Sequence, residues 1–575
     1  MVKRLIAVLL LTAAPAFGAV GEICGDGIDN DASGGDAACA EPDKDRDGYP
    51  SSSAYTGPYG SAVDCDDTNR NIYPGNGGRY VNVGAGTYKT CQTDGTYTGT
   101  LNLSAFTCHT GSGGTYWFDD TGNNATGSGT FAAPWRDYVC ISNSGAGCYH
   151  APVAGDCFVF RSGSYNGTWS DAGTTRMLYV NNKDGTSSNH ITIMEAPGEV
   201  ADIAGTGTTP TEVRPAYILL SDYVDFFGID VHGGYSAAGV WVAESANNEV
   251  AGLSTYNIDG DNTGNVGGIK ATGVGSGPLS IHHIKTYDNY DRANSTAENN
   301  YGVVIMDLAS VSITDSVGYN TTTGIGSHIF AIKHGYSGGS GTFKRNVCFR
   351  GERSCFVFEQ PNTTITNNYA EEIGGNNSSE TFEFRYLGNG PIYDSGVIQY
   401  NTINKAPFFE LINAAGTIGA SSVLNAQYNV VLDNRGTSYP ADGTDGFIRI
   451  GYYGFDSEYT DIVDGGKLTI NNNCYYNSAA TALFFTLFGA TSGGYGDGSN
   501  GTKGADYASF AAWQAKYDAA SYSENPTFNS DGGATSTNCS TKGWNKNIFT
   551  DAAPTSTGTT SSGRGFVLPK RRTRG

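Results

Sequence analysis

The feature that most constrains the fold is an apolar position that recurs along the chain. In the later repeats an asparagine follows it at a fixed distance. The apolar positions recur at intervals of 22 to 44 residues, at Val224, Val250, Ile281, Ile313, Phe343, Ile365, Ile398, Ala426 and Ile470. An asparagine stands three residues after each of the last five, at Asn346, Asn368, Asn401, Asn429 and Asn473. Because stacked amides can hydrogen-bond to one another, this column predicts an asparagine ladder inside a repeated turn.

A second series of short alternating segments lies between these positions. Its members are Val240-Trp-Val, Ile269-Lys-Ala, Val303-Val-Ile, Phe330-Ala-Ile, Phe356-Val-Phe, Phe382-Glu-Phe and Phe409-Glu-Leu. Alternation of this kind places one face of a strand in the core and the other outside. One coil cannot bury its apolar face alone, so stacked coils must share a continuous core. The sequence therefore predicts an all-β parallel β-helix over 115–545, with caps at both ends.

The ends of this region also carry a resemblance. The N-terminal part contains Tyr116-Trp117-Phe118, Pro134-Trp135 and Gly155-Asp156, and the C-terminal part contains Phe510-Ala-Ala-Trp513 and Asn525-Pro526. Both parts resemble secreted right-handed parallel β-helix proteins of the pectin-lyase-like class. That class includes lyases, hydrolases, epimerases, adhesins and phage tailspikes, so the resemblance implies the fold and leaves the activity open.

Composition narrows the partners and the compartment. The chain has 575 residues, 81 of them glycine, and a formal net charge of −22, which argues against nucleic acid as a partner. Residues 1–18 have the pattern of a signal peptide: Lys3 and Arg4, an apolar run, and Ala16-Phe17-Gly18. The apolar run is too short to span a membrane. We therefore expect a secreted, extracellular or cell-surface protein.

The cysteines support that expectation. All twelve follow the signal peptide, and an even number in a secreted chain favours disulfides over free thiols. The expected bridges are Cys24–Cys39, Cys348–Cys355 and Cys474–Cys539.

An acidic module is expected over 19–78. Asp43, Asp45 and Asp47 place carboxylates at alternate positions before a glycine, and further carboxylates return at Asp64, Asp66 and Asp67. Hard oxygen donors at this spacing favour calcium, and a solvated acidic spacer is the alternative.

The same module carries a second resemblance. With Cys24-Gly-Asp26-Gly-Ile-Asp29-Asn30-Asp31 and Asn71-Ile-Tyr-Pro-Gly75, the carboxylate segments resemble the MopE-type metal-binding motif of bacterial surface proteins. A Cys-containing connector is expected over 79–114. A flexible Ser/Thr/Gly tail with a basic end is expected over 546–575.

Alignment of the second series predicts two outward columns of side chains. Within each column, residues on successive coils are about 4.8 Å apart. One column contains Met306, Lys333, Glu359 and Arg385, and its neighbour contains Val304, Ala331, Val357, Glu383 and Glu410, with Arg449 near the next coil. Elimination on a uronic acid needs a cation and a base, for which Lys333 or Arg385 is available. Hydrolysis needs two carboxylates, for which Glu359, Glu383 and Glu410 are available. Trp241 and Tyr386 are candidates for stacking on sugar rings.

A structural interpretation of these charges stays open beside the catalytic one. Lys333, Glu359 and Arg385 can equally form a salt-bridge ladder between coils. His282 and His283 are interpreted as ordinary surface residues on a strand flank.

Three functional hypotheses follow from the sequence. The first is a secreted bacterial protein that binds an extracellular polysaccharide and cleaves it as a lyase or hydrolase. The second is a non-catalytic adhesin or structural protein of the cell surface, stabilised by calcium. The third is a calcium-dependent assembly unit that self-associates, because the end of a solenoid can template stacking.

Overall fold

The structure is a computed structural model, and it describes the central part of the chain most fully. The described residues are 63, 65, 80–82, 88–91, 97–101, 502–507, 522–523 and most of 113–489. Within 113–489 the gaps are 172–173, 197–198, 206–211, 236–237, 261–264, 290–299, 321–327, 334–338, 350, 352–353, 361, 372–380, 387–394, 405, 407, 414–422, 433–447, 451–467 and 477–484.

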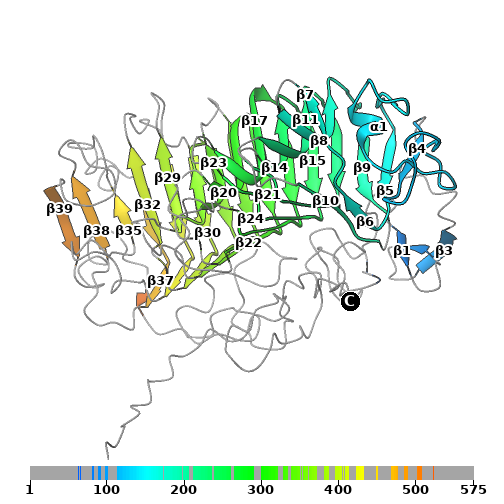
Figure 1. Cartoon of the computed structure of the whole chain (residues 1–575). Coiled ribbons are helices and arrows are strands. Elements are labelled where there is room, and N and C mark those ends of the chain that lie inside the picture. The colour runs from blue at the N-terminus through cyan, green and yellow to red at the C-terminus, as the bar shows by residue number, and fades with distance from the viewer. Residues whose placement is uncertain are drawn as a thin grey trace, which may run out of the picture.

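Three long sheets run along a stack of coils, and each full coil contributes one strand to each sheet (Figure 1). Sheet A contains β4 (Thr115–Phe118), β5 (Cys157–Phe160), β9 (Ile191–Glu195), β12 (Val224–Phe227), β15 (Asn248–Ala251), β18 (Leu279–His282), β21 (Ser310–Thr314), β24 (Ser340–Lys344), β27 (Asn362–Thr366), β30 (Ser395–Gln399), β33 (Val423–Gln427) and β36 (Leu468–Asn471). Sheet B contains β6 (Gly163–Tyr165), β10 (Ala201–Ala204), β13 (Asp230–His232), β16 (Ser254–Tyr256), β19 (Lys285–Tyr287), β22 (Val317–Tyr319), β25 (Val347–Phe349), β28 (Tyr369–Glu371), β31 (Thr402–Asn404), β34 (Val430–Leu432), β37 (Cys474–Tyr476) and β40 (Tyr522–Ser523). Sheet C contains β7 (Trp169–Asp171), β8 (Thr174–Asn181), β11 (Val213–Leu219), β14 (Ala238–Ala243), β17 (Val266–Ser276), β20 (Asn300–Leu308), β23 (His328–Lys333), β26 (Phe356–Phe358), β29 (Phe382–Tyr386), β32 (Phe409–Asn413), β35 (Ile448–Ile450), β38 (Phe485–Gly489) and β39 (Thr502–Tyr507).

Pairing within the sheets is parallel except at the two ends of sheet C. There β7 pairs with β8, and β38 with β39, in the antiparallel sense. The predicted all-β parallel β-helix is therefore confirmed. The expected connector contains a three-stranded antiparallel sheet of β1 (Tyr80–Asn82), β2 (Tyr88–Cys91) and β3 (Tyr97–Leu101).

The predicted apolar positions form one column in sheet A. The register joins Val250, Ile281, Ile313, Phe343, Ile365, Ile398, Ala426 and Ile470. The residue that pairs with Val250 in β12 is Phe226, so the choice of Val224 for that coil is wrong by two residues. The side chains of Val224 and Phe226 are both buried. An error of two residues in the alignment therefore leaves the same face of β12 in the core.

The asparagine ladder is confirmed. At each of the four junctions between successive asparagines, the Oδ1 of one accepts the backbone N–H and the Nδ2 of the asparagine one coil earlier. The N···O distances are 2.9–3.0 Å for the backbone donors and 3.0–3.2 Å for the side-chain donors. All five asparagines are buried. The ladder thus satisfies polar groups at a turn that lies against the core.

This turn is the corner between sheets A and B, and it has the same backbone shape in coil after coil. One residue with positive φ precedes a buried residue; the positive-φ residues are Gly228, Gly252, His283, Asp315, Arg345, Asn367, Tyr400, Tyr428 and Asn472. The buried residue that follows is Ile229, Leu253 or Ile284 in the earlier coils, then Ser316, and then the five asparagines. The corner is therefore apolar at one end of the stack and polar at the other.

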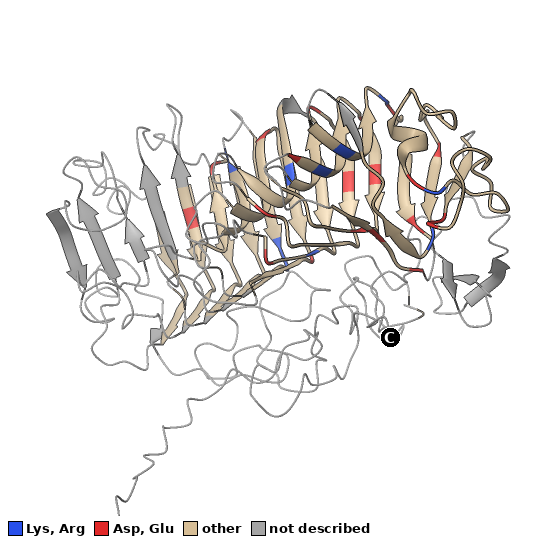
Figure 2. Cartoon of the chain, in the orientation of Figure 1, with Lys and Arg blue, Asp and Glu red and all other residues tan. Residues whose placement is uncertain are grey.

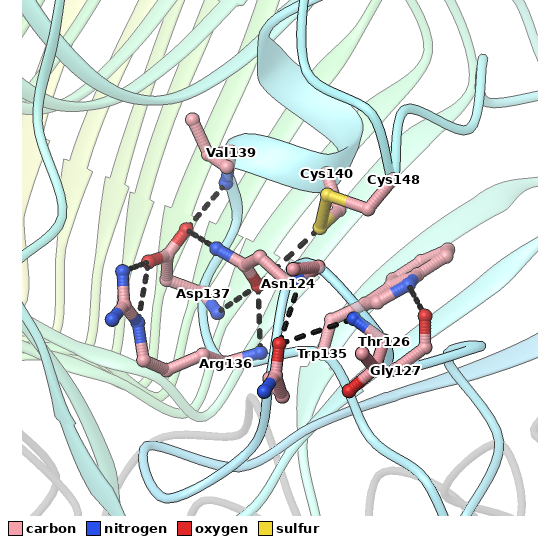
Figure 3. Close-up of a disulfide and its surroundings, with 11 residues drawn as sticks. Asn124, Thr126, Gly127, Trp135, Arg136, Asp137, Val139, Cys140 and Cys148 are labelled. Atoms are coloured by element: carbon pink, nitrogen blue, oxygen red, sulfur yellow. Dashed lines mark hydrogen bonds and ion pairs between the residues drawn. A yellow bond between two sulfur atoms is a disulfide. The ribbon is translucent and has the colours of Figure 1, made fainter.

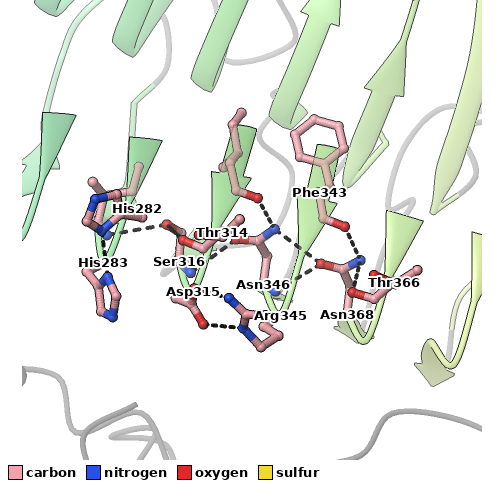
Figure 4. A network of polar contacts seen from close by, with 12 residues as sticks. His282, His283, Thr314, Asp315, Ser316, Phe343, Arg345, Asn346, Thr366 and Asn368 are labelled. Atoms are coloured by element: carbon pink, nitrogen blue, oxygen red, sulfur yellow. Dashed lines mark hydrogen bonds and ion pairs between the residues drawn. The ribbon is translucent and has the colours of Figure 1, made fainter. Parts of the chain in front are cut away.

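Three of the positive-φ positions bring charged groups together (Figure 4). The guanidinium of Arg345 donates to both carboxylate oxygens of Asp315, at 2.6 and 2.8 Å. His283 lies one coil earlier and is 5% exposed, so its interpretation as a surface residue is wrong. Its Nδ1 lies 2.7 Å from Nδ1 of His282. Burial alone would raise the pKa of the Asp315 carboxyl, but Arg345 and, to a smaller extent, the charge of His283 lower it.

Two disulfides fix loops of the described chain. Cys348–Cys355 confirms one predicted bridge. Cys140–Cys148 was not predicted; it ties the short helix α1 (Val139–Ser142) to the loop that follows (Figure 3). Cys474 is also in a disulfide, but Cys539 lies outside the described residues.

Asp137 holds the chain just before α1. Its Oδ1 accepts the backbone N–H of Val139 and the side-chain amide of Asn124, both at 3.0 Å (Figure 3). No helix in the described part of the chain is long and apolar enough to cross a membrane.

Candidate functional site

The outward face of sheet C carries the predicted charged column. The register joins, one residue per strand, Tyr179, Tyr217, Trp241, Lys270, Val304, Ala331, Val357, Glu383, Glu410 and Arg449. The alternating neighbours of this column, such as Ile218, Ile269 and Ile332, belong to the hydrophobic core. The predicted order from Val304 to Glu410 is therefore confirmed, and Arg449 continues it.

The second predicted column is also in register. Met306 pairs with Lys333, and the backbone N–H of Glu359 donates to the carbonyl of Ile332 at 2.8 Å, which places Glu359 on the coil next to Lys333. Arg385 follows on β29. Adjacent strands of a sheet are about 4.8 Å apart, so these charges stand one coil from one another.

Some predicted residues lie outside the described side chains. The backbone places Arg385 on β29 and Glu410 on β32, but their side chains are not described. The expected calcium ligands Asp43, Asp45, Asp47, Asp64, Asp66 and Asp67 lie outside the described residues altogether.

Lys333 is held by two neutral groups. Its Nζ donates to the hydroxyl of Tyr301 at 2.7 Å and to Oδ1 of Asn265 at 3.1 Å. The same Nζ lies 5.1 Å from the centre of the Tyr301 ring. Asn265 also donates its Nδ2 to the sulfur of Met306 at 3.2 Å, which fixes the amide orientation. The ammonium is thus pointed back along the face toward the phenol.

Tyr301 covers the apolar middle of the outward face. It is fully buried and packs in one cluster with Val304, Ala331 and Val357, with Met306 at the edge. This packing explains why an outward face that is expected to be solvated is closed over these coils.

A histidine and a carboxylate continue the arrangement on the other side of Tyr301. The ring of His328 stacks on that of Tyr301, with centroids 5.2 Å apart and planes at 10°. Nδ1 of His328 is 4.0 Å from Oε2 of Glu383, and the hydroxyl of Ser354 donates to the same oxygen. We call Tyr301, His328, Lys333, Ser354 and Glu383 the lysine–tyrosine network.

The network is almost completely shielded from water. Lys333, Glu359 and Glu383 are 5%, 2% and 4% exposed, and Tyr301 and His328 are buried as well. Charges and dipoles interact more strongly in such a site than in water. The ammonium of Lys333 and the hydroxyl of Tyr301 therefore face each other at 2.7 Å in a place that excludes water.

Tyr301 and His328 were missed by the sequence interpretation. Each stands two residues before the aligned apolar residue of its strand, Val303 or Phe330, and they pair with one another. Extending the aligned segments by two residues toward the N-terminus would have shown that Tyr301 and His328 are neighbours on adjacent strands. The sequence gives no sign that the Tyr301 side chain lies along the face to reach Lys333.

Of the comparisons with known proteins, only the one with solved structures found similar proteins. No protein-family model matches the chain, and no curated protein matches its sequence. The chain is similar to the crystal structure of pectate lyase Pel9A, with 15% identity over 60% of this chain and 86% of that one and a TM-score of 0.41. It is also similar to an alginate lyase from Paenibacillus sp. str. FPU-7, with 15% identity, 53% and 95% coverage and a TM-score of 0.35.

A third similar structure is a glycoside hydrolase rather than a lyase. The GH136 lacto-N-biosidase from Eubacterium ramulus is 13% identical over 64% of each chain, with a TM-score of 0.36. Identities and TM-scores in this range do not transfer an activity or a site to this chain.

Proposed function

We propose that this protein binds an acidic polysaccharide on the outward face of sheet C and cleaves it by β-elimination at the lysine–tyrosine network. The observation that carries the proposal is the 2.7 Å hydrogen bond between Nζ of Lys333 and the hydroxyl of Tyr301 on the outward face, where the Tyr301 ring stacks on His328. An acid–base pair of this kind is what elimination next to a carboxylate requires.

In the proposed reaction Tyr301 takes one proton from the substrate and Lys333 gives one to it, so the pair neither gains nor loses protons overall. The phenolate of Tyr301 takes the proton from the carbon next to the carboxylate, a carbon–carbon double bond forms, and the bond to the leaving sugar oxygen breaks. The ammonium of Lys333 gives its proton to that oxygen. Proton transfer from the phenol to the amine through their hydrogen bond then restores the starting state.

Hydrolysis is the other chemistry that these residues can supply. It would use Glu359 and Glu383 as the two carboxylates, with Glu410 on the next coil. The two chemistries differ in product: elimination leaves an unsaturated sugar that absorbs ultraviolet light, and hydrolysis does not.

Tyr301→Phe is the sharpest test of the proposal. It removes the hydroxyl but keeps the ring that stacks on His328 and packs on the apolar middle of the face. We expect turnover of uronic-acid polysaccharides to fall by about 10²- to 10⁴-fold, the usual contribution of a general acid or base, with folding unchanged. Tyr287→Phe, in the stacked tyrosines of sheet B, is the matched control and should keep full turnover. Full turnover in Tyr301→Phe would exclude the mechanism.

One observation favours a second candidate function. All described members of the network are buried, so substrate has to open the face above them before any chemistry. A non-catalytic adhesin or structural protein of the cell surface needs no such opening, and its network would serve packing alone. Binding of a polysaccharide without release of any product would support this second function.

The proposal includes secretion and a calcium-binding module at 19–78. Secretion is supported by the pattern of residues 1–18, and calcium by the alternate carboxylates of Asp43, Asp45 and Asp47. Both rest on the sequence.

A further inference from the structure

Aromatic and basic side chains alternate at the N-terminal end of the outward face of sheet C. We call this set the aromatic–cation strip; its rings are Tyr179, Tyr217 and Trp241, and its cations are Arg176, Arg214 and Lys270. The ring centroids are 5.4 Å apart between Tyr179 and Tyr217 and 4.9 Å apart between Tyr217 and Trp241. The strip therefore advances by one side chain per coil, as the register requires.

Each cation of the strip lies over a ring. The guanidinium of Arg176 is 4.2 Å from the centre of Tyr179, and that of Arg214 lies between Tyr217 and Trp241 at 4.7 and 4.4 Å. Nζ of Lys270 is 4.5 Å from the centre of the Trp241 ring. Such contacts hold flexible basic side chains in one place and reduce the entropy lost when they bind a ligand.

The indole of Trp241 is fixed as well. Its Nε1 donates to the hydroxyl of Thr272 at 3.1 Å. A fixed, partly exposed indole between two cations is a preorganised contact for a ligand that has both apolar faces and negative charge.

Carboxylates also act on the strip. Glu212 accepts from Nε of Arg214 at 2.7 Å, and Glu244 acts on Tyr217 through its charge. Burial raises the pKa of Tyr217, while the charges of Arg214 and Arg176 act to lower it. The three cations of the strip lie on nearby coils of a chain whose net charge is −22, and charged residues are sparse on the described strands (Figure 2).

The strip and the lysine–tyrosine network lie on the same face of sheet C, which is closed over Val304, Ala331 and Val357. The column that contains Tyr217, Trp241 and Lys270 runs through Val304 and reaches Glu383 on the same outward face. Three strand spacings separate β14 from β23, which is about 14 Å. A linear polymer that follows the axis of the stack therefore meets the strip before it reaches Lys333.

We propose that the aromatic–cation strip binds a stretch of an acidic polysaccharide with one carboxylate per sugar, and holds that chain along the axis of the stack toward the lysine–tyrosine network. This inference rests on the proposed function for its ligand class. A sugar in an extended chain is about as long as one coil is high, so neighbouring carboxylates face Arg176 and Arg214, and the carboxylate two sugars beyond Arg214 faces Lys270. The sugar faces and the fixed indole supply the apolar part of the contact.

Lys270→Gln tests the strip, and Lys285→Gln is its matched control. Lys285 makes the same kind of contact in sheet B, with its Nζ 4.9 Å from the centre of Tyr287, so its replacement removes the same charge and the same cation–ring contact from another face. Binding of oligogalacturonate and oligomannuronate is measured by calorimetry in the Lys333→Ala protein, so that turnover does not consume the probe.

The expected result is a Kd that is about tenfold higher with Lys270→Gln, with a weaker dependence on salt, and unchanged with Lys285→Gln. Equal weakening by both variants would assign the effect to total charge and overturn the inference. Equal affinity for a neutral oligosaccharide of the same length, or for a single-stranded oligonucleotide, would overturn it as well, and so would a failure to bind either uronate probe.

These outcomes are separate from those of the proposed function. Binding that depends on Lys270, together with no product from the unmodified protein, would keep the strip and exclude elimination. Turnover that depends on Tyr301 but has a KM unaffected by Lys270→Gln would keep elimination and exclude the strip.

Discussion

Removal of a central rung of the asparagine ladder should destabilise the β-helix by an amount that its hydrogen bonds define. Asn401 is fully buried, and its side chain makes four hydrogen bonds. Two are accepted from Asn368, one is donated to the carbonyl of Ile365, and one is donated to Asn429. At about 1 kcal/mol each, Asn401→Ala loses about 4 kcal/mol of unfolding free energy.

The geometry also predicts where the loss appears. The backbone N–H of Asn368 donates to Oδ1 of Asn401 at 2.9 Å, and alanine offers no acceptor in its place. A buried amide without a partner costs about 1–3 kcal/mol, which is part of the total. We therefore expect amide hydrogen exchange at Asn368 to accelerate more than exchange at strands several coils away.

Urea denaturation and hydrogen exchange together test this reasoning. Asn425→Ala is the control, because Asn425 lies on β33 of sheet A but is partly exposed, and surface changes of this kind stay within about 0.5 kcal/mol. If Asn401→Ala costs no more than Asn425→Ala, or if exchange at Asn368 is unchanged, the ladder does not hold the corner and the reasoning is refuted.

The remaining predictions concern pH, a disulfide and calcium. Burial alone would raise the pKa of Asp315, but Arg345 outweighs it and holds the pKa well below its usual range, so the pair stabilises the fold above about pH 4 and loses that contribution as pH falls. Arg345→Met should flatten this dependence in urea titrations and cost about 3–5 kcal/mol at neutral pH, because it leaves a buried carboxylate alone. Replacing Cys348 and Cys355 by alanine should cost about 2.5 kcal/mol in the same assay, from the short loop that the bridge closes; an unchanged denaturation midpoint would contradict this. Calorimetry of the full chain should show calcium binding that Asp45→Ala removes, and equal heats for the two proteins would exclude the site.

Much of the fold could be predicted because the coil repeats. A strand alternates with a period of two, so once Ile313 and Phe343 are recognised as equivalent, the faces of all residues around them are set. The same logic gave the column from Val304 to Glu410 and the five rungs of the ladder. It failed by two residues at Val224, where both inward positions of β12 are apolar and the pattern cannot choose between them.

The corner between sheets A and B shows a second limit. Glycine marks the left-handed residue at Gly228 and Gly252, but His283 and Arg345 adopt the same conformation with full side chains. Residues other than glycine adopt positive φ at an energetic cost and rarely do so, so a histidine or an arginine in the sequence does not indicate this conformation. Because the corner was not recognised, the approach of His283 and Arg345 to Asp315 was not predicted.

The closure of the candidate site depends on a side-chain direction that the pattern does not contain. Tyr301 is the second residue of β20, and its side chain packs with Val304, Ala331 and Val357 while its hydroxyl reaches Lys333 on the neighbouring strand β23. Lys333 is therefore buried beside a phenol and an amide. Transfer of an ammonium from water into such a place is costly, and an apolar side chain of similar size would avoid that cost. The proposed elimination explains the lysine by proton exchange with Tyr301, and a structural network explains it by the hydrogen bonds to Tyr301 and Asn265. This difference is why Tyr301→Phe, which leaves the packing and removes only the hydroxyl, separates a catalytic network from a structural one.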